Sequence, residues 1–418
     1  ETTSQLHALR IQSNNTMFFR RIRVSVLDKT VCVVGLGYIG LPTASLLGTK
    51  GYRVHGVDTS QHVVDTINQG KIHIVEPDLD ILVKSAVQAG NLTASLEPVE
   101  ADIFILAVPT PFKGDHEPDL TYVEMATRKI APYVRPGNLV ILESTSPVGA
   151  SDGIVAWILS ELGHDTEKDV FVAHCPELVE LVQNDRIVGG INEASTEMAV
   201  EFYHSFVSGE VLSTDSRTAE LAKLTENAFR DVNIAFANEL SIICDQEGIN
   251  VWELIKLANR HPRVNILEPG PGVGGHCIAV DPWFIVSRAP QLARLIRTAR
   301  EVNDYKPSWV IEKVKRCADK FKHPVIGCLG LAFKANVDDL RESPAVEIVR
   351  KLVADNGGEI RVAEPNLKAH KEFDLRPWEE VISAADILLL LVDHKEFRRI
   401  KVADLKEKIL IDTRGVVK

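Results

Sequence analysis

Short apolar runs recur along the first half of the chain, and longer segments with helical spacing of apolar residues separate them. The first run, residues 30–34, leads directly into a glycine-rich turn and then into an apolar helical segment that ends near Lys50. Similar runs follow at 54–58, 103–108, 139–143 and 170–173. Apolar strands that alternate with helices are typical of a parallel sheet covered by helices on both faces. This part of the chain is therefore predicted to form a doubly wound α/β domain.

The stretch 214–248 contains no glycine or proline before its last residue, and it opens with two candidate capping residues, Asp215 and Ser216. At about 1.5 Å per residue, one continuous helix here would be over roughly 40 Å long. We expect such a helix to connect domains and to pair with a partner.

Lys223, Asn227 and Arg230 fall on one face of this helix, because they are three to four residues apart. Such a face is either solvated or lies beside a reacting group. In the second case a lysine and an asparagine are suited to stabilising an oxyanion.

The last third of the chain repeats the alternation on a smaller scale. Helical patterns occur at 292–302, 309–322 and 346–355, and strand patterns occur at 324–330, 359–363 and 385–392. The chain is thus predicted to form an α/β fold with two Rossmann-like doubly wound parallel-sheet domains joined by a long central helix. The similarity of the two halves is expected to be architectural only. The expected division is an extension at 1–28, a first domain at 29–213, a central helical region at 214–321 and a second α/β domain at 322–418.

Basic residues lie near the expected strand ends of this second domain. Lys334 follows Phe333, and Arg341 and Arg414 lie close to other strand ends. In an acidic protein, this placement predicts a second ligand that bears phosphate. Surface ion pairs are the alternative.

Composition narrows the function classes. The formal net charge is −11 and no basic run occurs, so nucleic acid is not an expected partner. The six cysteines lack Cys-x-x-Cys spacing, which argues against a zinc site or a disulfide framework and favours a reducing, cytoplasmic location. No apolar run reaches the ~18 residues that would span a bilayer, and the first 28 residues lack the features of a signal peptide.

Gly35, Gly37 and Gly40 form a Gly-x-Gly-x-x-Gly motif between the first strand and a helix. The first two glycines permit a tight turn and a close backbone approach, and the helix N-terminus can hold a pyrophosphate. The next predicted strand ends at Asp58, 21 residues after Gly37, where a carboxylate can accept hydrogen bonds from ribose hydroxyls. An acid there would repel a 2′-phosphate, so the motif predicts NAD rather than NADP. A purely structural βαβ unit is the alternative.

Polar residues follow three of the later apolar strands. Thr110, Thr145 and Glu177 come just after the strands predicted at 103–108, 139–143 and 170–173. Ligands bind beyond the carboxyl ends of strands in open α/β sheets. These three residues are therefore site candidates, although each is also an ordinary turn residue.

The segment GPGVGGHCIAVD, residues 270–281, presents a cysteine on a glycine-rich loop. Glycines let the backbone approach a ligand closely and leave little room for a packed core. A lone cysteine is commonly a small buried hydrophobe, but this context favours Cys277 as a nucleophile, with Asp281 four residues later.

These features lie within a longer series of motifs. The chain contains, in this order, GLGYIGLPTA, VPTPFKGDHEPD, ESTSPVG, RTAELAKLTENAFRDVNIAFANEL, NRHPRVNI, PGPGVGGHCIAVDPWF, AREVND, GLAFKANVDDLRESPA and LLVDHKEF. Together they resemble the UDP-glucose/GDP-mannose (nucleotide-sugar 6-) dehydrogenase family, from Val31 to nearly the end. As a set, the motifs are most similar to the branch that oxidises UDP-N-acetyl-D-mannosamine. The loop GGHCIAVDPWF resembles the N-acetylhexosamine branch, whereas relatives that act on UDP-glucose usually carry a GGSC-type loop.

The resemblance implies a homodimer with an NAD domain, a central helical dimerisation region, a C-terminal UDP-sugar domain and active sites shared between subunits. It implies NAD-dependent four-electron oxidation of the sugar C6 alcohol of a UDP-N-acetylhexosamine through a thiohemiacetal and a thioester on Cys277. With this chemistry, the candidate catalytic residues are Cys277, Lys223, Asn227, Asp281, Thr145 and Glu177. The candidate cofactor contacts are Gly35, Gly37, Tyr38, Ile39, Gly40, Asp58, Thr110, Thr145 and Arg341. The candidate substrate contacts are Lys223, Asn227, Arg230, His261, Arg263, Gly274, Phe333, Lys334 and Arg414, with His261 and Arg263 expected from the neighbouring subunit.

The chain departs from the family pattern after Glu177. The family continues with an Arg-Val-Leu-Pro-Gly-like loop, whereas residues 178–182 here are Leu-Val-Glu-Leu-Val. A basic residue expected to contact the substrate is missing from this stretch. Either the loop is shorter in this protein, which would put sugar binding in doubt, or part of the loop is absent from the printed sequence, which is the explanation that we favour.

Two other functions remain open on the sequence. A two-electron hydroxyacid dehydrogenase of similar build would use a helix lysine and asparagine but would need no cysteine. A non-catalytic NAD-binding regulatory protein would show no turnover.

Overall fold

The computed structural model describes residues 29–74, 76, 78–114, 116–176, 185–355 and 357–417. The chain forms two compact units, which divide between Leu224 and Thr225. None of the helices in the described part combines the length and the apolar character needed to cross a membrane.

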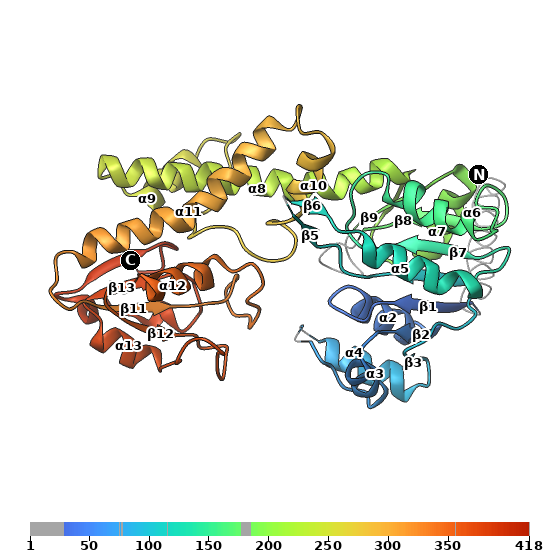
Figure 1. Cartoon of the computed structure of the whole chain (residues 1–418), viewed down its shortest axis with the longest axis horizontal. Helices are drawn as coiled ribbons and strands as arrows, with labels where there is room; N and C mark the ends of the chain where they lie inside the picture. Colours follow the sequence, from blue (N-terminus) through green and yellow to red (C-terminus); the bar gives the residue numbers. More distant parts are fainter. Residues whose placement is uncertain are drawn as a thin grey trace, which may run out of the picture. The chain divides into compact units, whose positions relative to one another are not determined.

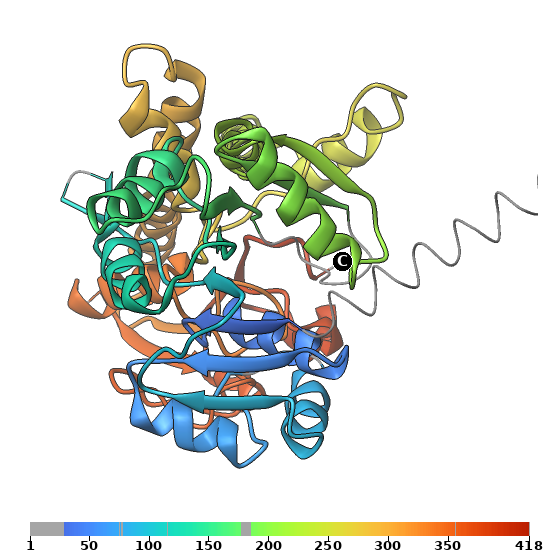
Figure 2. The ribbon, with the colours of Figure 1, turned by 90° about the vertical axis from the view of Figure 1, so that its right-hand side faces the viewer.

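The first unit is built on an eight-stranded sheet with the strand order β10-β9-β8-β7-β4-β1-β2-β3. Its strands are β1 (Thr30–Val34), β2 (Arg53–Val57), β3 (Leu92–Ser95), β4 (Ile103–Leu106), β7 (Leu139–Leu142), β8 (Phe171–His174), β9 (Arg186–Gly190) and β10 (Val211–Asp215). Figure 2 shows β1, β2 and β3 side by side in blue. The predicted parallel sheet is confirmed with one exception, because β9 runs antiparallel to β8. A separate hairpin joins β5 (Phe112–Lys113) and β6 (Glu117–Pro118).

Helices cover both faces of this sheet, because every strand of its centre buries both sets of alternating side chains. In β1, Val31 and Val33 belong to one core and Cys32 and Val34 to the other. The first core is closed by α2 (Gly40–Thr49), α3 (Gln61–Asn68), α4 (Leu79–Gln88) and α7 (Glu193–His204). The second is closed by α5 (Thr121–Ile130), η1 (Ala131–Tyr133), η2 (Ser151–Ala156) and α6 (Trp157–Glu161).

The predicted long helix is confirmed as α8 (Ser216–Glu247), which begins in the first unit and continues in the second. The Asp215 carboxylate accepts from the backbone N–H of Thr218 at 2.9 Å, as expected for a residue that caps a helix N-terminus.

The second unit combines helices with a four-stranded parallel sheet of order β12-β11-β13-β14 (Figure 1). The strands are β11 (Val325–Leu329), β12 (Glu359–Ala363), β13 (Ile387–Leu390) and β14 (Ile409–Asp412). The helices are α8, α9 (Val251–Ala258), α10 (Asp281–Arg288), α11 (Arg294–Ala318), α12 (Pro344–Ala354) and α13 (Trp378–Ala384), with short turns η3 (Phe397–Arg399) and η4 (Val402–Leu405). One sheet face packs on α11 and α12, and the other packs on α13.

The prediction of separate helices at 292–302 and 309–322 is wrong, because α11 runs unbroken through Pro307. A proline inside a helix removes one backbone hydrogen bond. Here Arg300 and Lys306, on the N-terminal side of Pro307, bond to α8, and Val310 and Val314, on the C-terminal side, pack into the core of the second sheet. These tertiary contacts hold the two halves in line.

The turn after β1 in the first sheet and the turn after β11 in the second sheet have the same backbone hydrogen bond. After β1, Gly35 (φ 91°) donates its N–H to Val57 O at 2.8 Å. After β11, Gly330 (φ 95°) donates to Ala363 O at the same distance. An acidic residue follows each partner strand, Asp58 in the first unit and Glu364 in the second. The second sheet therefore repeats the start of a dinucleotide-type turn.

Candidate active site

The glycine motif forms a tight turn whose glycines are required for different reasons. A Cβ on Gly35 would lie 2.4 Å from Ala107 O, and one on Gly40 would lie 1.8 Å from Gly35 O, so neither position admits a side chain. A Cβ on Gly37 would meet nothing within 4 Å. Tyr38 and Ile39 complete the turn, and both are half-buried. The turn thus leaves open space at Gly37, at the N-terminus of α2, where a pyrophosphate can approach the backbone.

The Asp58 carboxylate lies at the end of β2 and is half-buried. Its two oxygens accept from the N–H groups of Leu36 (3.1 Å) and Ser60 (2.9 Å). An ionised carboxylate has about four acceptor positions, so capacity remains for ribose hydroxyls. The turn and the acid together fit a dinucleotide.

Thr110 and Thr145 lie together where β4 and β7 end. The Thr110 hydroxyl donates to Thr145 O at 2.7 Å. The structure thus brings these two predicted site residues to one edge of the first sheet. Glu177, the third strand-end candidate, and the departing segment behind it at 178–182 lie outside the described residues.

The predicted cysteine loop forms a turn that is locked to α8. Cys277 is half-buried, and its carbonyl accepts from the N–H groups of Val280 (3.0 Å) and Asp281 (2.8 Å). Asp281 opens α10 and is buried, and its Oδ2 accepts from Asn227 Nδ2 at 2.6 Å. Asn227 on α8 is therefore a neighbour of the Cys277–Asp281 turn in the second unit, although Asn227 and Asp281 are 54 positions apart in the sequence.

The glycines before Cys277 let the loop lie flat against the segment that carries Phe333. A Cβ on Gly274 would lie 2.5 Å from Glu342 O and 2.9 Å from Phe333 Cβ. Gly275 (φ 86°) faces the Phe333 ring at 2.8 Å by the same measure, and its N–H donates to Arg341 O at 3.0 Å. The cysteine loop and the loop after β11 thus form one surface.

The basic candidates near this surface have acidic neighbours. The exposed Arg341 guanidinium pairs with Asp339, and Arg414 pairs with Asp393 at 3.0 Å. The Arg414 side chain also reaches the start of the cysteine loop, since a Cβ on Gly270 would lie 2.8 Å from its Nη1.

Other candidates lie at exposed positions. Lys334, Arg230, His261 and Arg263 are exposed, and the Arg263 N–H donates to His261 Nδ1 at 3.3 Å. Lys223 is half-buried and lies one helical turn before Asn227 on α8, within the first unit.

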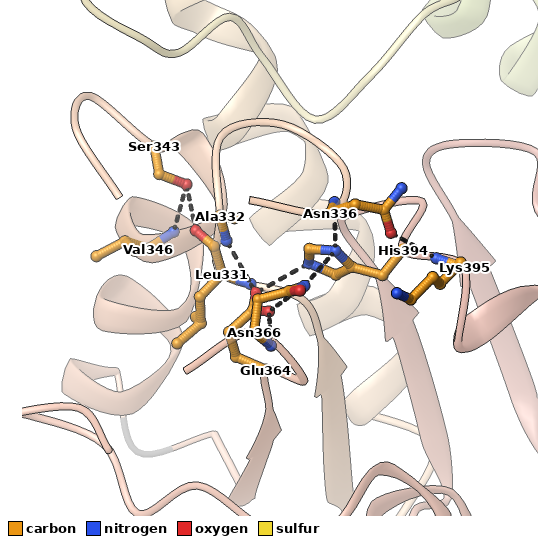
Figure 3. A network of polar contacts seen from close by, with 9 residues as sticks. All are labelled: Leu331, Ala332, Asn336, Ser343, Val346, Glu364, Asn366, His394 and Lys395. Carbon is orange, nitrogen blue, oxygen red and sulfur yellow. Dashed lines mark hydrogen bonds and ion pairs between the residues drawn. The ribbon is translucent and has the colours of Figure 1, made fainter. Parts of the chain in front are cut away.

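A buried network holds the loop from Leu331 to Asn336, which follows β11 (Figure 3). In the sequence, Lys334 lies within this loop. Glu364 accepts from Leu331 N–H at 2.7 Å and from His394 Nε2 at 3.0 Å. The Asn336 N–H donates to His394 Nδ1 at 2.9 Å, which requires the proton of the ring to be on Nε2. The loop is thereby fixed to the ends of β12 and β13.

The carboxylate of Glu364 is ionised in this network. Burial alone raises its pKa, but the hydrogen bonds from His394 and from backbone N–H groups outweigh burial, so the pKa lies below its usual range. Glu364 occupies the position that Asp58 holds in the first unit, yet His394 covers it. It therefore braces a loop rather than facing open space.

Sequence reasoning missed Glu364 and His394. The signal for Glu364 was an acid directly after the strand at 359–363, as for Asp58. It was obscured because α12 begins at Pro344 rather than directly after Gly330, so the glycine turn is not followed at once by a helix.

Family models match most of the chain. The NAD binding domain of the UDP-glucose/GDP-mannose dehydrogenase family matches residues 29–207, its central domain matches 217–305 and its UDP binding domain matches 327–418. The turn at Gly35 and Asp58 lies in the first match, and Cys277 lies in the second.

Individual relatives agree over nearly the full length. The chain is 58% identical over 407 residues to an NDP-N-acetyl-D-galactosaminuronic acid dehydrogenase from Ralstonia solanacearum, covering 93% of this chain and 96% of the relative. It is 55% identical over 415 residues to the UDP-N-acetyl-D-mannosamine dehydrogenase of Escherichia coli K12, covering 93% and 99%.

Solved structures give the same picture. The UDP-N-acetyl-mannosamine dehydrogenase of Staphylococcus aureus superposes with a TM-score of 0.86 at 40% identity, covering 93% of this chain and 96% of that chain. A UDP-glucose dehydrogenase from Pyrobaculum islandicum gives 0.84 at 25% identity, covering 93% and 95%. The chain therefore belongs to the UDP-glucose/GDP-mannose dehydrogenase family and is an NAD-dependent nucleotide-sugar dehydrogenase.

Proposed function

We propose that this protein oxidises the C6 alcohol of UDP-N-acetyl-D-mannosamine to the carboxylate of UDP-N-acetyl-D-mannosaminuronate. Support comes from relatives named for that sugar at 55% and 40% identity. The Ralstonia relative, at 58%, is named for a galactosamine-derived sugar, so another UDP-N-acetylhexosamine, or UDP-glucose, is the alternative substrate.

One observation carries the assignment of the chemistry. Cys277 is half-buried on a glycine-rich turn, and the turn ends at a buried carboxylate that receives the Asn227 amide. Of the six cysteines, four are buried and only Cys277 and Cys317 are half-buried. A thiol in such a loop can contact a substrate, whereas the mechanism of a two-electron hydroxyacid dehydrogenase does not require a cysteine.

The proposed reaction has two oxidations. Loss of a hydride and a proton from the C6 alcohol gives an aldehyde. The Cys277 thiolate adds to the aldehyde carbon, and the resulting alkoxide takes up a proton to give a thiohemiacetal. Loss of a second hydride and proton leaves a thioester, which water hydrolyses to the carboxylate and the free thiol. Lys223 and Asn227 are assigned to stabilising the oxyanion, Asp281 to orienting water or moving protons, and Thr145 and Glu177 to supporting roles.

When bound, NAD supplies the hydride acceptor for each step, so that one turnover uses two molecules of NAD. Gly35, Gly37 and Gly40, with Tyr38 and Ile39, would hold its pyrophosphate, and Asp58 would hold a ribose. Thr110, Thr145 and Arg341 are proposed as further contacts.

The UDP-sugar is assigned to the surface formed by the cysteine loop and the loop after β11. Lys334 and Arg414 would meet phosphate, Gly274 and Phe333 would line the site, and Arg230 would contact the substrate from α8. We assign residues 29–213 to the NAD domain, 214–321 to the central region and 322–418 to the UDP-sugar domain.

We further propose a homodimer formed through α8, with sites shared through His261 and Arg263. Phe229, Phe236 and Ile243 recur every seven residues on α8 and are 69%, 50% and 49% exposed. An apolar stripe with this spacing on a long helix suits pairing with a second helix. An NAD-linked enzyme with scattered cysteines is assigned to the cytoplasm.

The test is a pair of serine variants assayed with UDP-N-acetylmannosamine, UDP-N-acetylglucosamine and UDP-glucose. A hydroxyl is a far weaker nucleophile than a thiolate near neutral pH, so Cys277→Ser should form no uronate while still binding NAD and substrate. Cys317→Ser, the other half-buried cysteine, should keep full activity. Undiminished uronate formation by Cys277→Ser would overturn the mechanism. A wild-type enzyme that turns over UDP-N-acetylglucosamine or UDP-glucose but not UDP-N-acetylmannosamine would refute the proposed substrate.

A further inference from the structure

A buried chain of polar side chains joins α8 to α11 and ends on the cysteine loop. Arg300 Nη1 pairs with Asp231 Oδ1 at 2.7 Å, and Asn303 Nδ2 donates to the same oxygen at 2.8 Å. Asn238 Nδ2 donates to Asn303 Oδ1 at 2.8 Å. Finally, Gly270 N–H donates to Asn238 Oδ1 at 2.8 Å. The four side chains are at most 2% exposed, so each depends on its partners in the network.

The direction of this chain is set at both ends. The Asp231 oxygen beside Arg300 accepts, so Asn303 must present its NH₂ to it. The Asn303 oxygen then faces Asn238, whose NH₂ must point there and whose oxygen remains for Gly270. The backbone N–H of Gly270 can only donate, so the far end requires the same arrangement. Both amide orientations therefore follow from the chemistry of the ends.

The chain of bonds terminates where the cysteine loop begins, and α8 holds the other end of that loop as well. Asn227 binds Asp281, and Asn238 binds Gly270. Asn227 and Asn238 are eleven residues apart, about three turns or roughly 16 Å, so both lie on the same face of α8. The segment 270–281, with Cys277 in it, is thus pinned to one rigid helix at both ends.

We propose that Asn238 is a positioning residue for Cys277, and that Asp231 and Asn303 orient its amide so that it fixes Gly270 and the loop that follows. The inference rests on the proposed role of Cys277 as the nucleophile. It assigns a role in the reaction to residues that do not touch substrate.

The test uses Asn238→Asp, the swap Asp231→Asn with Asn238→Asp, and Gln246→Glu as a matched amide-to-acid control at an exposed position on α8. In Asn238→Asp, the amide that donates to Asn303 is lost. Asn303 then lies between two carboxylates and has only one NH₂ group, so in either orientation of its amide one carboxylate faces the Asn303 oxygen without a donor between them. The swap keeps the net charge and reverses the two amide bonds: the amide introduced at position 231 donates to Asn303, and Asn303 donates to the carboxylate introduced at position 238, which also accepts from Gly270. Arg300 can only donate, so its bond is not reversed, and it keeps the carboxylate of Asp304 as its partner.

Three quantities are measured: kcat, the KM for NAD, and the alkylation rate of Cys277 by iodoacetamide relative to Cys317 in the same chain. Asn238→Asp should lower kcat roughly 10- to 100-fold, since a displacement of a reacting group by about 1 Å can reduce the rate by up to about 100-fold. The KM for NAD should be nearly unchanged. Its Cys277 alkylation rate should change about threefold or more while that of Cys317 does not. The swap should recover roughly half of the loss on a logarithmic scale, and Gln246→Glu should match the wild type.

Two results would overturn the inference. One is a folded Asn238→Asp variant with the wild-type kcat and the wild-type Cys277 alkylation rate, and the other is a swap that recovers neither kcat nor the alkylation rate. If Asn238→Asp does not fold, Asn303→Ala removes the middle link and must change the Cys277 alkylation rate about threefold or more while that of Cys317 stays unchanged. The proposed function has its own test, because Cys277→Ser that still forms uronate refutes the nucleophile. The alkylation rates would still report whether Asn238 positions the loop.

Discussion

At the scale of single residues, the carboxylate of Asp58 has two roles. It accepts backbone N–H groups from Leu36 and Ser60, which shapes the turn, and it is assigned to the ribose of NAD. Its negative charge also disfavours a 2′-phosphate. Removing the side chain and removing only the charge should therefore have different effects.

We predict that Asp58→Ala weakens NAD binding and narrows the preference for NAD over NADP, because the acceptor and the repulsive charge are lost together. Asp58→Asn keeps an acceptor oxygen and the side-chain shape, so it should narrow the preference while weakening NAD binding less. Steady-state kcat/KM values for both cofactors measure this. If the ratio of kcat/KM for NAD to that for NADP is unchanged in both variants, Asp58 does not bind the ribose.

At the scale of elements, the contact between α8 and α11 contains several buried polar side chains. Besides the chain from Asp231 to Gly270, Lys306 donates to Ser241 and lies 4.4 Å from the centre of the Trp309 ring. Lys306 is 2% exposed, and burial, aided by the charge of Lys313, lowers its pKa from 10.5 to about 7.

This pKa predicts a specific pH dependence of stability. Between about pH 7 and 10.5 the unfolded chain holds a proton on Lys306 that the folded chain has released, so stability rises with pH across that window. Lys306→Met removes the titration. The stability of the wild type relative to Lys306→Met should therefore grow from pH 7 to pH 9, by up to about 1.4 kcal/mol per pH unit. Urea unfolding at both pH values measures the difference, and a constant difference would show that Lys306 is not a buried, readily deprotonated amine.

Local signals made most elements predictable, and non-local contacts account for the errors. The eight predicted strands and α8 follow from apolar runs and from the absence of glycine and proline, which are properties of contiguous sequence. β3 and β10 lie outside the predicted runs, because exposed side chains interrupt their apolar pattern. The unbroken α11 does not, because Pro307 argues for a break and only contacts with α8 and with the second sheet oppose it.

The same division holds for the site. Gly37, Asp58 and Cys277 stand in short motifs whose chemistry is legible in sequence. The bond from Gly270 to Asn238 joins residues 32 positions apart, and the one from Asn238 to Asn303 joins residues 65 apart. No local pattern distinguishes such asparagines from solvated ones, so their role emerges only from the packing of the two helices.

At the scale of the whole molecule, the proposed dimer makes each site depend on two chains. Arg263 is exposed in the second unit, just after α9. If Arg263 contributes to the partner's site, a substitution of Arg263 impairs the partner's site. A substitution of Cys277 in the same chain impairs that chain's own site.

Mixing inactive Cys277→Ala chains with inactive Arg263→Ala chains tests this. A hybrid dimer would hold one site with both defects and one with neither, so up to about half of the wild-type activity per hybrid should return. Each variant refolded with itself provides the baseline, and hybrids are verified by tagging the two chains differently. Verified hybrids without activity would place Arg263 within its own site or outside any site.

The central claim is a four-electron oxidation through Cys277, and counting NADH tests it most directly. A limiting amount of UDP-N-acetyl-D-mannosamine is converted to exhaustion with excess NAD, and the NADH formed is divided by the sugar consumed. The account predicts two NADH per sugar, with uronate as the product. One NADH per sugar, with a carbonyl product, would contradict it and would favour a two-electron dehydrogenase.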